Sequence, residues 1–302
     1  MIERIVVPLD GSMTAEAILP QVRRVLYRND SEIILVRAMP MPLVEEAIVT
    51  AEVELGAARE YVMGQVEKLQ RQGVRVRHVL RRGSPVEVIL DVVASEKATL
   101  IALATHGKTG LQRFLLGSVA EDLLRRSPVP VLLVRPFWSY DLTPPKGAEL
   151  RPVRSILLPI DGSGLARRAL PGFLEFASLF EARIVLLRIL EGAGSRAVEA
   201  PENSKARAEL DDLAKEIEKR GVETVRLLGT GDPVSRILDT VREQSIDVIA
   251  MTTHGRRGLS RMKHGSLTEE VLRKAEVPLL VTRSEVPSGA LSTPPVKGGI
   301  YV

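Results

Sequence analysis

The chain has 302 residues, of which 45% are hydrophobic and 26% are charged, and its formal net charge is +4. This length and composition are typical of a globular protein with about two domains. The absence of cysteine excludes disulfides, thiolate nucleophiles and cysteine metal sites.

Membrane, nucleic-acid and metal binding are not expected either. Apolar runs stay well below the roughly 20 residues of a membrane helix, and Glu3 and Arg4 interrupt any signal-peptide pattern. Basic residues are spread along the chain without interleaved aromatics, unlike those of nucleic-acid-binding proteins. The four histidines form no pair at metal-ligand spacing. We therefore expect a cytoplasmic protein.

The first half of the chain alternates strand-like and helical patterns. Strands are expected at residues 4–9, 32–36, 74–79, 100–103 and 129–134, and helices at 15–26, 44–69, 84–97 and 118–126. Alternating strands and helices predict an α/β fold, with a parallel sheet covered by helices on both faces.

Several helix starts carry capping signals. The Ser-x-x-Glu spacing of a capping box occurs at 84–87, 118–121 and 266–269. We expect each serine hydroxyl to cap its helix, a contribution of about 1 kcal/mol.

The second half of the chain repeats the first. Residues 155–171 align with 4–20 at an offset of 151 (Asp161 against Asp10), and residues 253–283 align with 105–135 at an offset of 148 (Thr253 against Thr105). The second copy has therefore lost three residues, which we place in or near its second helix. Asp232 replaces Ser84 as a helix cap. Each copy is long enough to bury its own core.

The repeat sets the expected domain boundaries. Domains are expected at 1–136 and 153–284, with a linker at 137–152 and a tail at 285–302. The linker contains Phe137, Trp138 and Tyr140. We expect these aromatic side chains to dock the linker as a plug.

Each copy carries the same glycine-containing loop after its fourth strand. Nine residues separate Gly107 from Gly117-Ser118 in the first copy, and nine separate Gly255 from Gly265-Ser266 in the second. A loop between a strand and a helix start presents free backbone N–H groups and the positive end of the helix dipole. The spacing predicts a phosphate cradle in each copy.

These motifs together resemble the universal stress protein family, twice in one chain. The resemblance rests on the openings Val-Pro-Leu-Asp-Gly-Ser and Leu-Pro-Ile-Asp-Gly-Ser, the two Thr-His-Gly…Gly-Ser loops, and the endings Val-Pro-Val-Leu-Leu-Val and Val-Pro-Leu-Leu-Val. It covers nearly everything except the linker and the tail. It implies two doubly wound five-stranded domains of strand order 3-2-1-4-5, paired through their last strands as an intramolecular pseudo-dimer. A further homodimer is an open alternative.

Family members that bind ATP carry Gly-x2-Gly-x9-Gly-Ser/Thr. The resemblance places its last two elements on the loops just described, but Ala104 and Thr252 replace the first glycine. Alanine is tolerated if its φ is negative, whereas threonine is branched and bulkier.

The resemblance also implies contacts at the adenosine end. It places the aspartates after the first strands against the adenosine, and main-chain groups near Ala38 and Ile189 against the adenine. The alternative is that the aspartates serve only as helix-start residues. The expected contacts are Asp10, Ala38, Ala104, His106, Gly107, Lys108, Gly110, Gly117, Ser118 and Val119 in the first copy, and Asp161, Ile189, Thr252, His254, Gly255, Arg256, Gly258, Gly265, Ser266 and Leu267 in the second.

The expected function is regulatory binding of adenine nucleotide in a stress response. The ligand is ATP, with Mg²⁺ arriving on the nucleotide. No pattern supplies a general base or a metal cage, so any ATP hydrolysis should be slow. Gly107-Lys108-Thr109 is not a P-loop, because Ala102 stands where that motif needs glycine.

Two alternatives remain. One is a non-nucleotide interaction module whose Gly-Ser loops are only helix caps, and the other is a nucleotide hydrolase. Lys263 and His264 replace Leu115 and Leu116 beside the second Gly-Ser pair. We therefore expect the first copy to bind more tightly.

Overall fold

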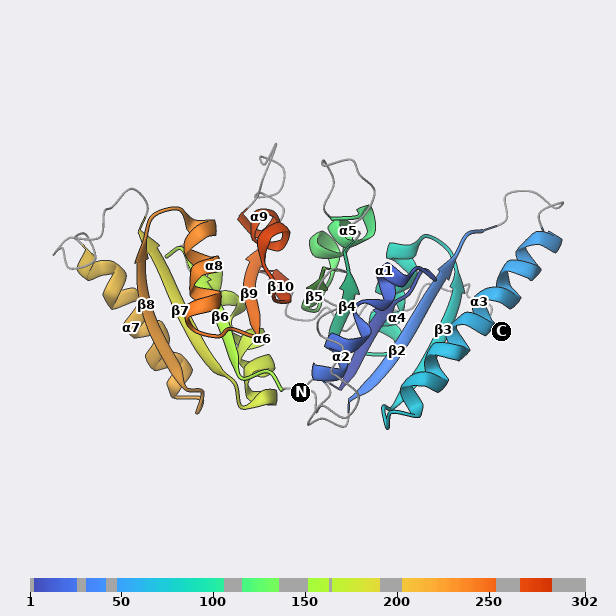
Figure 1. Ribbon diagram of the computed structural model, residues 1–302, viewed down its shortest axis with the longest axis horizontal. Helices are drawn as coiled ribbons and strands as arrows, with labels where there is room; N and C mark the ends of the chain where they lie inside the picture. The colour runs from blue at the N-terminus through green and yellow to red at the C-terminus, as the bar shows by residue number, and fades with distance from the viewer. Residues whose placement is uncertain are drawn as a thin grey trace. The chain divides into compact units, whose positions relative to one another are not determined.

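The structure is a computed structural model that describes residues 3–25, 31–41, 48–105, 116–135, 152–162, 165–190, 203–253 and 267–283 (Figure 1). The described residues up to 135 belong to one compact unit, and those from 152 onward belong to a second. Each unit contains a five-stranded parallel sheet with helices packed on it.

The first unit has the strand order β3-β2-β1-β4-β5, as predicted. Its strands are β1 (Arg4–Pro8), β2 (Glu32–Met39), β3 (Val76–Arg82), β4 (Leu100–Ala104) and β5 (Val131–Val134). Its helices are α1 (Met13–Glu16), α2 (Leu19–Val25), α3 (Ile48–Gln70), α4 (Pro85–Ser95) and α5 (Ser118–Arg126).

The second unit repeats this topology, because its strands follow the order β8-β7-β6-β9-β10. The strands are β6 (Ser155–Ile160), β7 (Arg183–Leu190), β8 (Thr224–Thr230), β9 (Val248–Thr253) and β10 (Leu279–Arg283). The helices are α6 (Leu165–Phe180), α7 (Ser204–Glu218), α8 (Pro233–Glu243) and α9 (Leu267–Lys274). The expected pairing of last strands between the copies stays a prediction.

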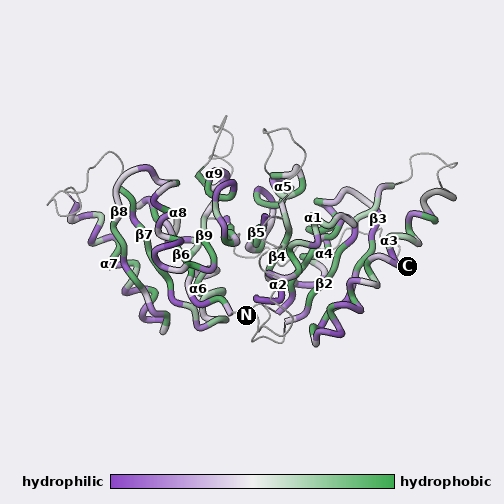
Figure 2. The backbone as a smooth tube through the Cα atoms, in the orientation of Figure 1, coloured by the Kyte–Doolittle hydropathy of each residue, from purple (hydrophilic) through white to green (hydrophobic). Residues whose placement is uncertain are grey.

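The core of each unit is built from aliphatic strands. Successive residues such as Ile5, Val6 and Val7 in β1 are fully buried. Successive side chains of a strand point to opposite faces of the sheet, so both faces are covered. Figure 2 shows hydrophobic colour along the strands and mixed colour along α3 and α7, as in helices with one face in water.

The three-residue deletion lies between β7 and β8, as predicted. β7 begins 151 residues after β2 (183 against 32), whereas β8 begins 148 residues after β3 (224 against 76). Gly73 and Gly221 end the intervening helical segments with φ of +77° and +79°, a conformation that favours glycine. The offset is therefore already 148 at this glycine, and α7 aligns with α3 at that offset.

The helix after the first strand differs between the units, and the prediction of one continuous helix at 15–26 is wrong. The chain forms α1 and α2, with Pro20 in the first turn of α2, where its missing N–H costs no hydrogen bond. In the second unit α6 runs through Pro171. The buried Phe173 and Phe176 anchor α6 to the core, which offsets the bond that Pro171 cannot make.

At α4 the predicted N-cap position is confirmed, but the predicted capping box does not form. Ser84 occupies the N-cap position, but its side chain makes no capping hydrogen bond within the described residues. The Glu87 carboxylate instead accepts two hydrogen bonds from the Arg126 guanidinium on α5, at 2.6 and 2.9 Å. These bonds lower the pKa of Glu87. Glu87 therefore forms an ion pair between α4 and α5 in place of the capping-box hydrogen bond.

The Asp232 cap is confirmed. Its carboxylate accepts hydrogen bonds from the backbone N–H of Ser235 at 2.8 Å and from the Ser235 hydroxyl at 2.7 Å. The backbone hydrogen bond is the main cause of a lowered pKa of Asp232.

Some expectations fall outside the described residues. Phe137, Trp138, Tyr140 and the tail at 285–302 are among them, so the aromatic plug stays a prediction. Of the helices that the structure describes, none has both the length and the apolar character needed to span a membrane.

Candidate functional site

The candidate site lies at the carboxyl ends of the strands, the upper end of each unit in Figure 1. In the first unit β1 lies between β2 and β4, and in the second β6 lies between β7 and β9. The chain connections reverse direction beside these central strands, which is where open parallel sheets bind ligands. The predicted residues Asp10, Ala38 and Ala104 therefore meet at one edge of the first sheet.

Asp10 follows β1 and is exposed. Its Oδ1 accepts hydrogen bonds from the backbone N–H of Ser12 at 2.9 Å and from the Ser12 hydroxyl at 2.6 Å. Ser12 is also the N-cap of α1, because its Oγ accepts from the Ala15 N–H. Gly11 completes the turn with a φ of +85°. Asp10 thus has a local structural role that does not depend on any ligand.

The second unit repeats this turn. Asp161 follows β6 and is exposed, and Gly162 has a φ of +78°. Ile189 lies in β7 and Thr252 lies in β9, the two neighbours of β6. The predicted residues Asp161, Ile189 and Thr252 therefore lie at the carboxyl edge of the second sheet, as their counterparts do in the first.

The residues that replace the first glycine of the loop pattern do not strain the backbone. Ala104 ends β4 opposite Val134, and Thr252 lies within β9 opposite Thr282. Neither residue has a positive φ. Thr252 therefore differs from glycine by the bulk of a half-buried side chain, and not by backbone strain.

The start of α5 differs from the prediction for Ser118. The N-cap is Gly117, and Ser118 is the first helical residue. The Ser118 hydroxyl is therefore one position too late to cap the helix, while the Gly117 carbonyl accepts the first helical bond from the Glu121 N–H at 3.0 Å. Ser118 is exposed and Val119 is half-buried. In the second unit Leu267 is the first described residue of α9.

The remaining predicted contacts lie outside the described residues and stay predictions. They are His106, Gly107, Lys108, Gly110, His254, Gly255, Arg256, Gly258, Gly265 and Ser266.

Three residues beside the first turn were not predicted. Arg37 on β2 donates from Nη1 to the Leu9 carbonyl at 3.3 Å. Tyr61 on α3 donates to Oε1 of Glu16 on α1 at 3.0 Å. Burial, followed by the bond to Glu16, raises the pKa of Tyr61 well above its usual range.

The second unit has different residues around its turn. Arg188 on β7 donates from Nη1 to the Ile189 carbonyl at 3.2 Å. Its Nε lies 3.9 Å from Oε2 of Glu209 on α7. Arg167 on α6 pairs with Glu216 on α7 at 3.4 Å. Two arginine–glutamate pairs thus stand where the first unit has one tyrosine–glutamate pair.

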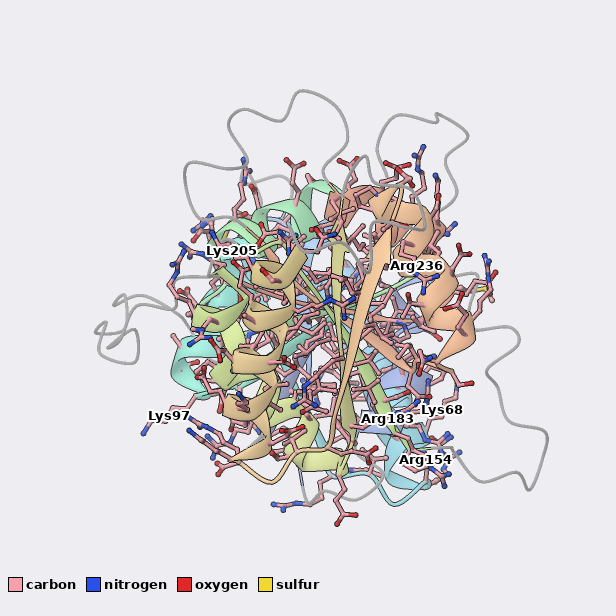
Figure 3. All side chains as sticks on the ribbon, turned by 90° about the vertical axis from the view of Figure 1, so that its left-hand side faces the viewer. Lys68, Lys97, Arg154, Arg183, Lys205 and Arg236 are labelled. Carbon is pink, nitrogen blue, oxygen red and sulfur yellow. The ribbon has the colours of Figure 1, made fainter. Side chains whose placement is uncertain are left out.

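Figure 3 labels four side chains of the second unit that mark the two ends of its sheet. Arg154 and Arg183 lie at the lower end of the view, at the amino ends of β6 and β7, while Lys205 and Arg236 lie toward the upper end. Glu209 is one helical turn after Lys205 on α7. Glu209 therefore belongs to the carboxyl edge, the edge that holds Asp161.

A sequence signal for the two arginines existed. Arg37 and Arg188 are 151 residues apart and are charged residues inside otherwise apolar strands. Tyr61 on α3 and Glu209 on α7 carry no such signal in the sequence. Predicting their positions would require knowing which face of each helix meets the turn.

Comparison with known proteins places the chain in a family. The profile of the universal stress protein family matches it twice, over residues 1–135 and 152–283. A universal stress protein of Mycobacterium tuberculosis is 29% identical over 263 residues, which span 81% of this chain and 82% of that protein. A universal stress protein of Methanocaldococcus jannaschii is 30% identical over 139 residues, which span 44% of this chain and 82% of that protein.

A solved structure agrees in fold. The crystal structure of a universal stress protein from Archaeoglobus fulgidus has a TM-score of 0.69 and 23% identity, and the match covers 94% of this chain and 100% of that chain. At this identity the likeness concerns the fold alone. The two profile matches and the two repeated sheets agree: the chain belongs to the universal stress protein family and carries the family's domain twice.

Proposed function

We propose that this chain binds adenine nucleotide, with ATP as the ligand, at the carboxyl edge of one or both sheets. The single observation that carries the proposal is the doubled Gly-x9-Gly-Ser loop, whose first copy leads into the start of α5. The proposed role is a regulatory signal in a stress response.

The start of α5 supports phosphate binding. The first backbone N–H groups of a helix have no acceptor within the helix. Gly117 adds no side chain at the cap, and the exposed Ser118 adds a hydroxyl beside those donors. This arrangement suits an anion, because hydrogen-bond donors and the helix dipole act in the same direction.

The neighbouring strand ends suit the adenosine. Asp10 lies one strand away from Ala38 and Ala104, so a nucleotide that runs from α5 toward β2 passes the Asp10 turn. Ala38 is half-buried, and its small side chain adds little bulk beside the main chain that is proposed to meet the adenine. Mg²⁺ would arrive on the phosphates of the nucleotide.

The proposal assigns regulation rather than turnover, with slow ATP hydrolysis at most. It includes domain boundaries at 1–136 and 153–284. The pairing of last strands, a further homodimer and a cytoplasmic location stay predictions.

Calorimetric titration of the purified full-length chain with ATP tests the proposal. Binding that is lost in Gly117→Trp, with an unchanged melting curve, would support it. Absence of heat and of competition at millimolar ATP, with the protein shown to be folded and empty, would overturn it.

One observation favours a second candidate, a non-nucleotide interaction module. The hydrogen bonds between Asp10 and Ser12 account for the aspartate without any ligand. Acid release of small molecules from the purified protein separates the two functions. Released adenine nucleotide supports the first, and its absence together with a flat ATP titration supports the second.

A further inference from the structure

The arginine near the end of the second strand has a different partner in each unit. Arg37 donates to the carbonyl of Leu9, on the turn that carries Asp10. Arg188, its counterpart 151 residues later, donates to the carbonyl of Ile189, on its own strand. Ile189 is the residue whose main chain is proposed to meet the adenine. A carbonyl oxygen has two lone pairs, and Arg188 takes one of them.

The arginines differ in partner because the helices that follow their strands, α3 and α7, carry different residues beside them. At the offset of 148 that α3 and α7 share, Tyr61 in the first unit corresponds to Glu209 in the second. The Tyr61 hydroxyl is directed to Glu16, so it places no charge on Arg37. Glu209 is a carboxylate beside Arg188, and this ion pair holds the guanidinium near the end of β7.

Glu209 also reaches the turn itself. A Cβ atom placed on Gly162 would lie 2.8 Å from Oε2 of Glu209 and 3.3 Å from Nη2 of Arg188. In the first unit the nearest atoms to a Cβ on Gly11 would be those of the Arg37 guanidinium, with Nη1 at 3.5 Å.

The carboxylates beside the two turns have different partners. Glu16, beside the first turn, accepts a hydrogen bond from Tyr61, whereas Glu209, beside the second turn, pairs with Arg188. Arg167, at the position of Glu16 in the second unit, pairs with Glu216. The second turn therefore has its arginine held by a carboxylate, while Arg37 donates to the Leu9 carbonyl.

We infer that Glu209 makes the two nucleotide sites unequal: it holds Arg188 on the Ile189 carbonyl, where the adenine is proposed to bind, so that ATP binds in the first unit. The inference rests on the proposed function. It assigns Glu209 as a specificity-determining residue, and Tyr61 as its permissive counterpart.

The test is calorimetric titration of full-length variants with ATP. We expect the wild type to bind one ATP per chain, and Gly117→Trp to bind none. Glu209→Tyr should create a second binding event, and the milder Glu209→Gln should create a weaker one. Glu218→Gln removes the same charge from the far end of the same helix, where Glu218 pairs with Arg226 on β8, and it should leave the titration unchanged.

The reverse exchange tests the first unit. Tyr61→Glu, combined with Glu16→Gln to avoid two adjacent carboxylates, keeps the net charge and moves the carboxylate to the position that Glu209 has in the second unit; it should weaken the single site by about tenfold. Melting curves identify any variant that fails to fold, and Glu209→Gln, which keeps the side chain's size, then decides the question.

The outcomes separate the inference from the proposed function. Two equal sites in the wild type, or one unchanged site in both Glu209 variants, would overturn the inference and leave nucleotide binding intact. An equal response of Glu218→Gln and Glu209→Gln would also overturn it, because net charge alone would then explain the effect. No ATP binding in any of the proteins would remove the proposed function and the inference together.

Discussion

The Tyr61 hydroxyl donates a hydrogen bond to Oε1 of Glu16 at 3.0 Å and so joins α3 to α1 beside the turn that carries Asp10. The two residues are 45 positions apart in the sequence. They tie two separate helices together at the edge of the sheet where the nucleotide is proposed to bind.

Loss of this bond should destabilise the first unit. Tyr61→Phe removes the donor and leaves the half-buried Glu16 without it, so we expect a loss of about 1 kcal/mol in the free energy of unfolding. Urea denaturation of the full-length chain measures it. Unfolding curves that superimpose would show that solvent replaces the bond at no cost.

The same tyrosine should make stability depend on alkaline pH. The pKa of Tyr61 is raised in the folded protein, first by burial, so above a pH of about 10 the unfolded chain loses the proton while the folded chain keeps it. The contribution of Tyr61 is therefore complete below pH 10 and declines as the pH rises further. Denaturation of wild type and Tyr61→Phe across this range should show the stability difference shrinking. A difference that is constant or grows would contradict the raised pKa.

The ion pair between α4 and α5 should be sensitive to acid. Arg126 lowers the pKa of Glu87, so the pair stabilises the folded state above the unfolded pKa of about 4.3 and loses this effect as the pH falls. Glu87→Gln should lower the melting temperature slightly at neutral pH and have no effect in acid. Because both side chains are exposed, added salt should also reduce the difference. A melting temperature equal to that of the wild type at neutral pH and low salt would show that the pair contributes nothing.

The two helix caps should respond differently to alanine. Asp232→Ala removes the acceptor of the Ser235 N–H and should lower the melting temperature. Ser84→Ala, at the matching position of the first unit, should leave it unchanged, because the Ser84 side chain makes no capping bond within the described residues. Equal effects of the two substitutions would contradict the assignment of the caps.

The sequence predicted the topology well because each strand is a short apolar run between helical patterns. Residues such as Ile101 and Ala102 are buried on successive positions, as expected of a strand covered on both faces. The repeat then predicted the second sheet and the position of its deletion. These features depend on local patterns, and local patterns are visible in one sequence.

The predictions that failed depend on contacts between elements that are distant in the sequence, or on where an element begins and ends. Ser118 and Ser84 have capping motifs, but the helix begins at Ser118 itself, and Glu87 is taken by Arg126. Ala104 replaces glycine without strain because β4 extends to that residue. The contrast between Tyr61 and Glu209 depends on which helix face meets the turn, and periodicity alone does not resolve that.

The proposed ATP site lies at the carboxyl edge of the first sheet. A crystal structure of the full-length chain grown with saturating ATP tests it most directly. We expect nucleotide density between Asp10 and Gly117, with weaker or no density beside Asp161. Empty edges in both units, or density in the second unit alone, would contradict it.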